Sequence, residues 1–519
     1  MAITVKSSHL VVNQPAPSAA VNPIAVVAVV MLGNFLGPLY SSTPNVLIPN
    51  LVATFGSDVD TMQWVLTGYM LGYSVTMPLA GWLADTYGRK RIFLIGLAVF
   101  TVASVLACLS WDASSLIGFR ILQAIGGGLI SPTGMAIITD VIPPAQRGTA
   151  LGLWGMGMML APSFGPWISG WIVDNLDDWH LVFWLGVPIG VVGLIAAARV
   201  LPPSEDRAHR DPPFDAVGFA TLSSALTLFL IPLTQGNRLG WDDPAIIGSL
   251  LASVVVFAVF TWNELRASSP MIDLSLFRDT GFSVAVALRG VLAVGYYFAI
   301  FLLPLFTQTI LGWPAALAGL VVLPAGLAMA ALMPISGWIS DRIGARWLVF
   351  TGMTIATVGS FFFATIDTDW TFARLAGDNV IRTGALGLLF TPLTLAALTN
   401  VPRNRVGNAS GILNTVWQVA GSVGIAVGQA YLTTQTANRY VGVVSSLNLR
   451  RLPVNAYVAH MHALGLAHHL PSANILLARL AAQVAIVRAY GDVFLLGAMI
   501  VAVATPFALL LPHKRWRNG

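Results

Sequence analysis

Charged residues are scarce in this chain, and their scarcity excludes an ordinary water-soluble protein. Only 9% of the 519 residues are Asp, Glu, Lys or Arg, whereas 56% are hydrophobic and the mean hydropathy is +0.77. A soluble domain has about 25% charged residues, because its surface must be hydrated. The composition therefore predicts that most of the chain lies in lipid.

Cysteine is almost absent, since Cys108 is the only one. A single cysteine excludes a disulfide framework within the chain. The sequence also lacks a Gly-x-x-x-x-Gly-Lys-Ser/Thr loop, the segment that binds nucleotide phosphates, so we expect neither nucleotide hydrolysis nor any other enzymatic activity, and no cofactor. Basic residues are scattered through short loops instead of gathered on one face, which argues against binding of nucleic acid.

Long apolar segments are abundant. A helix of about twenty apolar residues crosses a hydrocarbon core of roughly 30 Å, whereas a membrane barrel would alternate polar and apolar residues. The sequence therefore predicts an all-α polytopic membrane protein with about fourteen transmembrane helices. The expected spans are 22–42, 62–82, 91–110, 114–138, 147–173, 179–199, 214–234, 245–264, 281–310, 315–339, 346–366, 372–399, 404–432 and 490–512.

Basic and acidic residues occupy alternate loops. Arg89, Arg147 and Arg342 lie in loops on the side of the termini, whereas Asp112 and Asp367 lie in loops on the other side. Basic loops mark the cytoplasm. We therefore expect a multi-pass protein of a bacterial inner membrane with both termini in the cytoplasm.

A ten-residue segment occurs twice. Residues 81–90 read GWLADTYGRK, and residues 337–346 read GWISDRIGAR. Glycine permits a tight turn and close helix approach, and an Asp at a helix end can accept hydrogen bonds from main-chain N–H groups. We expect these two loops to change partners during conformational change, through two glycines and an Asp that recur in both copies and through Arg89 of the first copy. These are Gly81, Asp85, Gly88 and Arg89 in the first copy, and Gly337, Asp341 and Gly344 in the second.

Two copies in the same orientation predict two parallel halves of six spans each. Two spans are then left between the halves. The expected organisation is a cytoplasmic tail (1–21), a six-helix bundle (22–200), two inserted helices (201–270), a second six-helix bundle (271–512) and a cytoplasmic tail (513–519).

One outer loop, residues 433–488, is long. It contains His460, His462, His468 and His469, but neither Cys nor a carboxylate joins these histidines. A weak metal site and a solvated helical hairpin are both open interpretations, and we take the hairpin as the default, with no metal.

The repeated loop resembles the signature loop of the major facilitator superfamily, and fourteen spans in this order resemble its drug:proton antiporter branch. Residues 120–128, RILQAIGGG, are similar to that superfamily's Arg-x-x-Gln-Gly motif. Gly165, Pro166 and Gly170 lie in a segment that resembles the antiporter motif, whose Gly-Pro pair bends a helix where the halves meet. The resemblance implies the major facilitator fold and proton-coupled efflux.

Three arginines, Arg120, Arg289 and Arg382, lie inside predicted spans, where a charge is costly and is therefore a functional candidate. The resemblance ties Arg120 to proton coupling; alternatively it holds helices together by binding carbonyl groups. Asp378 precedes Arg382 by one helical turn, so the two can form a proton-responsive pair or a static ion pair.

Two departures from the family pattern bear on coupling and substrate. Tyr40 stands where the resemblance implies an Asp in the first span, and Trp417 stands where relatives typically have an Arg. The residue that couples protons is therefore left open. We predict a substrate cavity formed by Tyr40, Arg289, Tyr296, Tyr297 and Trp417, which would repel cations and favour anionic or neutral amphipathic compounds. Packing and interface anchoring are the alternative role for the aromatic residues.

The sequence therefore predicts a proton-driven efflux carrier for hydrophobic, amphipathic or anionic toxic compounds that works by alternating access. Such a carrier resembles the inner-membrane part of a tripartite pump that joins a periplasmic adaptor and an outer-membrane channel. Two alternatives are a dedicated exporter of one metabolite, such as an aromatic or fatty acid, and a membrane sensor that does not transport.

Overall fold

The computed structural model describes residues 22–203, 214–267, 270–446 and 470–512, and these residues form helices and connecting turns without a β-strand. The predicted all-α fold is confirmed. The first half contains α1 (Pro23–Ser42), α2 (Ile48–Phe55), α3 (Val59–Tyr87), α4 (Arg89–Cys108), α5 (Ala113–Val141), α6 (Arg147–Leu176), α7 (His180–Trp184) and α8 (Gly186–Val200). Between the halves lie α9 (Ala216–Leu239) and α10 (Pro244–Glu264). The second half contains α11 (Thr280–Thr309), α12 (Ala315–Ile343), α13 (Ala345–Phe363), α14 (Phe372–Gly384), α15 (Gly387–Leu398), α16 (Val406–Ser446) and α18 (Leu470–Ala504).

Twelve helices in the described part of the chain are long and apolar enough to cross a membrane. The two remaining predicted spans coincide with α3 and α6, which are 29 and 30 residues long but less apolar. Both pack against the other half of the protein, α3 against α16 and α6 against α12. A helix that faces protein can carry more polar residues than one that faces lipid. The chain is thus a multi-pass membrane protein, and a count of fourteen spans stays a prediction.

Helix ends follow local sequence signals. The carboxylate of Asp112 accepts a hydrogen bond from the N–H of Ser115, 2.6 Å away, and the Ser115 hydroxyl donates back across the first turn of α5. The main-chain N–H of Ser115 lowers the pKa of Asp112, because it stabilises the carboxylate. Gly88 and Gly344 have φ angles of +95° and +87°, so each glycine ends one helix and starts the next at the corresponding place in the two halves.

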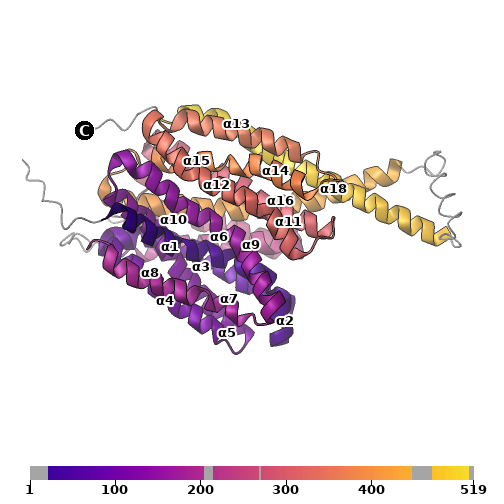
Figure 1. Ribbon diagram of the computed structural model, residues 1–519, viewed down its shortest axis with the longest axis horizontal. Helices are drawn as coiled ribbons and strands as arrows, with labels where there is room; N and C mark the ends of the chain where they lie inside the picture. Colours follow the sequence, from indigo (N-terminus) through magenta and orange to yellow (C-terminus); the bar gives the residue numbers. More distant parts are fainter. Residues whose placement is uncertain (1–21, 204–213, 268–269, 447–469, 513–519) are drawn as a thin grey trace, which may run out of the picture.

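The two halves pack along two seams. In Figure 1 the first half, from indigo to magenta, lies beside the second half, from pink to yellow. Helix α6 packs along α12 at one seam, and α3 packs along α16 at the other. The inserted helices α9 and α10 pack against each other, and α9 contacts both α3 and α16. The insert therefore covers one seam of the molecule.

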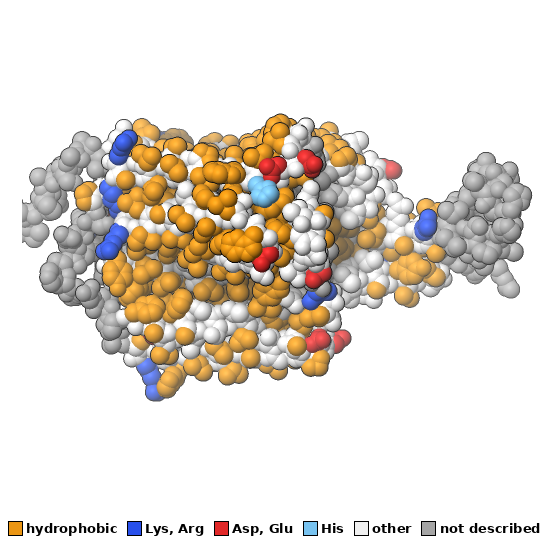
Figure 2. Space-filling model, turned by 90° about the horizontal axis from the view of Figure 1, so that it is seen from below, with side chains coloured by type: hydrophobic (Ala, Val, Ile, Leu, Met, Phe, Trp, Pro, Cys, Tyr) orange, Lys and Arg blue, Asp and Glu red, His pale blue; other side chains and the backbone are white. Residues whose placement is uncertain are grey.

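Charged side chains gather at the two ends of the helical body. Figure 2 shows Lys and Arg mainly at one end, Asp and Glu mainly toward the other, and a hydrophobic band between them. We call these ends the basic end and the acidic end. The start of α1 and the end of α18 lie at the basic end (Figure 1). Since successive membrane-length helices run in alternate directions, the turns after α3 and α12 lie at this end too.

The described parts of the predicted outer segment, residues 433–488, are helical. Helix α16 continues to Ser446 and α18 begins at Leu470, so both helices extend beyond the body at the acidic end (Figure 1). Arg439 of α16 donates through Nε and Nη2 to the two carboxylate oxygens of Asp492 of α18, each at 2.7 Å. Much of 433–488 is therefore helical, because this pair and the helical apolar spacing hold the helices together. The four histidines lie outside the described residues.

Candidate functional site

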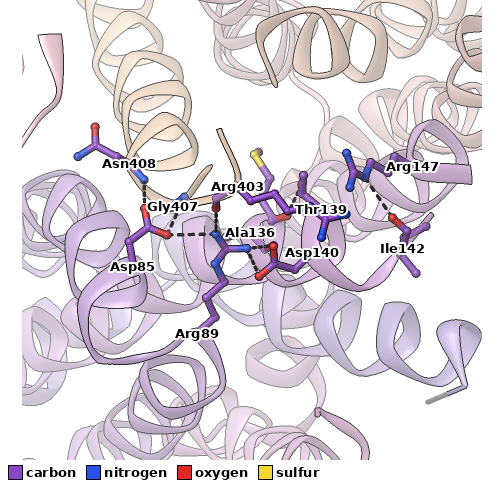
Figure 3. Close-up of polar contacts among 11 residues, drawn as sticks. Asp85, Arg89, Ala136, Thr139, Asp140, Ile142, Arg147, Arg403, Gly407 and Asn408 are labelled. Atoms are coloured by element: carbon purple, nitrogen blue, oxygen red, sulfur yellow. Dashed lines mark hydrogen bonds and ion pairs between the residues drawn. The ribbon is translucent and has the colours of Figure 1, made fainter. Parts of the chain in front are cut away.

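The first repeated loop contacts the opposite half of the protein at the basic end. Asp85, on the last turn of α3, accepts hydrogen bonds from the main-chain N–H groups of Gly407 at 3.2 Å and Asn408 at 3.0 Å (Figure 3). Both N–H groups belong to the first turn of α16, where helix N–H groups lack intrahelical partners. The carboxylate satisfies them and also interacts favourably with the positive end of the helix dipole.

Arg89 forms an ion pair with Asp85 and holds its carboxylate in position. Its Nη2 donates to Asp85 Oδ1 at 3.1 Å and to the carbonyl oxygen of Arg403 at 2.8 Å, and its Nη1 donates to the carbonyl oxygen of Ala136 at 2.8 Å. Arg89 also forms an ion pair with Asp140 of α5 (Figure 3). The guanidinium therefore joins α3, α4 and α5 of the first half to the turn that precedes α16.

The second repeated loop makes the equivalent contact in the reverse direction. Asp341, on the last turn of α12, accepts a hydrogen bond from the main-chain N–H of Gly148 at 3.1 Å, in the first turn of α6. Each half thus places a carboxylate on the start of a helix of the other half. We call these contacts, made by Asp85 and Asp341 with Gly407, Asn408 and Gly148, the basic-end junction.

Glycines allow the helices of the junction to meet. A Cβ on Gly81 would overlap the carbonyl oxygen of Gly407, and a Cβ on Gly337 would overlap the carbonyl oxygen of Gly148. Real Cβ atoms do not approach backbone oxygens so closely, so only glycine fits at these positions. Gly81 and Gly337 were predicted from the repeated loop, whereas their partners, Gly407 and Gly148, were not.

A sequence signal for the partners exists. Residues 143–148 read PPAQRG and residues 402–407 read PRNRVG, so a Pro precedes each partner glycine by the same spacing. In both copies the Pro lies just before a short 3₁₀ turn that starts the following helix. This second repeat marks the helix starts that receive Asp341 and Asp85.

A small cavity lies where the two halves face each other, with an empty volume of about 280 Å³. Its lining comes from α1, α3 and α6 of the first half and from α11 and α16 of the second. The lining residues are Pro38, Ser41, Tyr73, Met158, Met159, Pro162, Tyr296, Tyr297, Trp417 and Gln418. Most of this space lies against side chains, so the central cavity has room for about one water molecule and is nearly closed, whereas pockets that enclose drug-sized ligands span roughly 300–1,000 Å³. Three residues predicted to line a substrate cavity, Tyr296, Tyr297 and Trp417, lie together there.

An aromatic layer separates this cavity from the basic-end junction. The rings of Trp154 and Phe390 lie 6.2 Å apart, and those of Phe390 and Trp417 lie 5.3 Å apart. All three side chains are buried. Trp154 precedes Met158 of the cavity by about one turn of α6, on the side toward the basic end. The layer and the junction together close the route from the cavity to the basic end.

Arg289 lies beside the rings of Phe390 and Trp417 and does not line the cavity. Its Nη1 donates to the Thr394 hydroxyl at 2.5 Å, and its guanidinium lies 4.2 Å from the centre of the Phe390 ring and 5.7 Å from that of Trp417. The side chain is fully buried, and its Nε and Nη2 have no hydrogen-bond partner among the described residues.

Arg120 has a different environment, since all three of its guanidinium nitrogens have partners. Nε donates to the carbonyl of Val65 at 3.3 Å, Nη1 to the side chain of Gln123 at 2.5 Å and Nη2 to the carbonyl of Tyr40 at 2.7 Å. The guanidinium also stacks on the ring of Tyr69 at 4.0 Å. In this structure Arg120 joins α1, α3 and α5, and none of these partners titrates near neutral pH.

Tyr40, predicted to line the substrate cavity, lies outside the lining of the central cavity in this structure. Its ring is buried within the first half, and its hydroxyl donates to the carbonyl of Val182 at 2.8 Å, with that of Phe183 at 3.2 Å. Successive residues of a helix point about 100° apart. The neighbouring Ser41, and not Tyr40, therefore reaches the cavity.

The predicted pair of Asp378 and Arg382 is not formed in this structure. Asp378 is half-buried and lies 3.9 Å from Nε of Arg374, one turn earlier on α14. Arg382 is buried, and its Nη2 donates to the carbonyl of Gly295 at 3.4 Å. The Arg382 side chain points toward α11, whereas the Asp378 carboxylate lies beside the exposed Arg374 side chain, so the two do not meet.

The predicted antiporter motif lies on α6. Gly165 approaches α1 so closely that a Cβ there would overlap the Ser42 hydroxyl. Pro166 lies inside the helix, where it removes one main-chain donor, and Gly170 is buried one turn later. The helix that carries these residues also packs along α12, whereas Gly165 itself faces α1 of the same half.

Comparison with known proteins gives the same family along most of the chain. The family model of the Major Facilitator Superfamily matches residues 30–425. The Multidrug export protein EmrB of Escherichia coli is 30% identical over 457 residues, which cover 88% of this chain and 89% of that protein. The Uncharacterized MFS-type transporter YhcA of Bacillus subtilis is 31% identical over 428 residues, 81% of this chain and 79% of that protein.

A solved structure agrees with the fold. The crystal structure of the human organic anion transporter MFSD10 (TETRAN) superimposes with a TM-score of 0.59 at 17% identity, and the match covers 92% of this chain and 99% of that one. The helical architecture, the family match and the named relatives lead to one conclusion: this chain belongs to the Major Facilitator Superfamily and is a transporter, not an enzyme.

Proposed function

We propose that this protein exports hydrophobic or amphipathic toxic compounds by alternating access, driven by inward movement of protons. The observation that carries this proposal is a central cavity between two halves whose basic ends are held together by reciprocal carboxylate contacts. Contacts between the starts and ends of helices can be broken and remade without unfolding either half. The junction is therefore suited to open and close one end of the route.

The basic end is proposed to face the cytoplasm, so this conformation is closed to the cytoplasm. Opening would require Asp85 and Asp341 to leave the helix starts that they now contact, and Trp154 and Phe390 to separate. A compound could then enter from the cytoplasm and be released at the other side after the junction forms again.

The cavity lining supports a broad range of substrates. Met158 and Met159 are flexible and polarizable, and Tyr296, Tyr297 and Trp417 offer large apolar faces with few fixed polar groups. Such a surface repacks around different shapes. The relative EmrB is named as a multidrug export protein, in agreement with this assignment.

Two parts of the proposal concern partners. Protons are the proposed coupling ion, with the Asp378 carboxylate on α14 as the proposed proton acceptor and Arg120 and Arg382 as the buried cations that respond. The extension formed by α16 and α18 is the proposed surface for a periplasmic adaptor, which would connect to an outer-membrane channel.

Everted membrane vesicles test the proposal, because their cytoplasmic face is outward. Uptake of the neutral dye Nile red under an imposed pH gradient is expected for the wild type, and reduced uptake for Asp378→Asn and Arg382→Ala. Uptake driven by sodium and not by protons would overturn the coupling ion. Transport of one compound alone from a panel of unrelated toxic compounds would favour the dedicated exporter instead.

A further inference from the structure

The guanidinium of Arg289 has one edge without a partner. Nε and Nη2 form the edge of an arginine that can bind both oxygens of a carboxylate at once. The same edge of Arg439 binds Asp492 in this way at 2.7 Å and 2.7 Å. In Arg289 this edge is buried and both of its nitrogens are unpaired among the described residues.

A purely structural role does not account for this edge. Arg120 is equally buried, yet main-chain carbonyls and Gln123 satisfy all three of its nitrogens. Arg289 has only the Thr394 hydroxyl, and no charged group of the described structure lies close enough to interact with it. A buried cation with unsatisfied donors is costly, so a residue kept in this state is suited to bind a partner that comes and goes.

The position of Arg289 indicates when that partner would bind. Arg289 precedes Tyr296 of the cavity by about two turns of α11, on the side toward the basic end. It also contacts Phe390 and Trp417, two members of the aromatic layer. A compound that entered from the basic end would therefore meet Arg289 before it reached the cavity lining.

We propose that Arg289 is an anion subsite that binds the carboxylate of an amphipathic organic acid through Nε and Nη2. The apolar part of the acid packs against Phe390 and Trp417 and extends toward the cavity. This assignment rests on the proposed function and names a substrate class for it.

A matched pair of ligands, 1-naphthoate and 1-naphthamide, tests the subsite because the two share a ring system and differ in the charge of one group. Their equilibrium binding is measured on the full-length purified protein in lipid nanodiscs. We expect the wild type to bind 1-naphthoate about 10-fold to 100-fold more tightly than the amide, the range for a hydrogen-bonded charge in a dry site.

Three variants assign this preference to the arginine edge. Arg289→Gln keeps a donor for Thr394 and is expected to lose the preference while it retains binding of the amide. Arg289→Lys keeps the charge but lacks the two parallel N–H groups that bind both oxygens of a carboxylate. We therefore expect its preference for 1-naphthoate to lie between those of the wild type and Arg289→Gln. Arg439→Gln is the control, since its edge is already occupied by Asp492 at an exposed site, and it is expected to behave as the wild type.

Thermal unfolding separates binding from a structural role. If Arg289 is a binding group, Arg289→Gln unfolds at a temperature equal to or above that of the wild type, and only the stabilisation by 1-naphthoate disappears. Wild-type protein without a preference for the acid, or a preference that survives in Arg289→Gln, would overturn the subsite. If Arg289→Gln does not fold, the comparison of 1-naphthoate with 1-naphthamide on the wild type and on Arg289→Lys still tests the subsite, because equal affinities for the two ligands would overturn it.

The outcomes also separate this subsite from the proposed function. Export of Nile red with no preference for the acid would end the anion subsite and leave the exporter intact. A preference for the acid that depends on Arg289, in a protein that exports nothing, would keep the subsite and end the exporter.

Discussion

Gly337 of α12 lies against Gly148 of α6 so closely that a Cβ on Gly337 would overlap the carbonyl oxygen of Gly148. Asp341, one turn after Gly337, accepts a hydrogen bond from the N–H of the same Gly148. The close packing and the hydrogen bond therefore depend on each other, and the same combination recurs with Gly81, Asp85 and Gly407.

Adding one methyl group at this position should hold the basic end open. Gly337→Ala leaves no room for α6, so the junction cannot form and efflux is lost, although α12 itself gains helix stability of roughly 0.5–1 kcal/mol. The measurement is labelling of Met158→Cys by an impermeant maleimide in everted vesicles, in a Cys108→Ser background that has no other cysteine. Labelling should be faster when Gly337 is replaced.

Gly319→Ala is the matched control, because Gly319 lies on the same helix and a Cβ there would meet nothing within 4 Å. We expect wild-type labelling and efflux. Slow labelling in Gly337→Ala would mean that the two helices can separate slightly without opening the route.

Neutralising the carboxylate of Asp85 or Asp341 should also favour the state that is open at the basic end, but less strongly than Gly337→Ala does. Asp341→Asn keeps an acceptor but loses the charge, and hydrogen bonds to charged groups exceed neutral ones by about 1 kcal/mol. That difference predicts a roughly fivefold rise in the open population. Asp85→Asn should have the larger effect, because Asp85 accepts from Gly407 and Asn408 and also binds Arg89.

Labelling of Met158→Cys reports both single variants and the double variant. The two carboxylates belong to separate contacts, so their effects on free energy should add. A double variant no more open than either single one would show that one contact alone holds the end closed.

Removal of the Asp378 charge should leave the fold nearly unchanged. Its carboxylate lies 3.9 Å from the exposed Arg374 side chain, and such a pair contributes about 0–1 kcal/mol. Thermal unfolding of Asp378→Asn and Arg374→Gln in nanodiscs should therefore give midpoints close to that of the wild type. A large loss of stability in Asp378→Asn alone would indicate that Asp378 has a buried partner in another conformation.

Tyr40 and Tyr297 should respond differently to loss of a hydroxyl group. Tyr40→Phe removes the donor to the Val182 carbonyl, a cost of about 1–3 kcal/mol for a buried acceptor left without a partner. Its unfolding temperature should fall while the range of exported compounds stays the same. Tyr297→Phe loses only a 3.4 Å contact to Gln418, so its stability should hold while the relative transport of different compounds changes.

Unfolding curves and uptake of a panel of compounds check this pair of variants. An altered compound range in Tyr40→Phe, or none in Tyr297→Phe, would show that the cavity in the transporting state has a different lining.

The sequence predicted the helical class, the family and the repeated loop, because hydropathy and short motifs are local properties. It could not show that Asp85 and Asp341 contact the opposite half, since that contact depends on how two bundles dock. The partner glycines, Gly148 and Gly407, were missed although a Pro at a fixed spacing marks both.

Side-chain direction was the other source of error. A position within a span does not show which neighbour it faces, so Tyr40 was assigned to the cavity that Ser41 lines. Helical spacing allowed Asp378 to pair with Arg382 or with Arg374, one turn away in either direction, and only the packed structure distinguishes them. The three buried arginines were found by their charge, but their different surroundings could not be inferred.

The inserted helices α9 and α10 lie at only one of the two seams, so the two flanks of the protein present different surfaces to the lipid. They cover the flank where α3 meets α16, whereas α6 and α12 pack directly against each other on the other flank. Solutes that dissolve in the hydrocarbon and diffuse sideways toward the protein therefore meet the inserted helices at one flank and the tight seam between the two halves at the other.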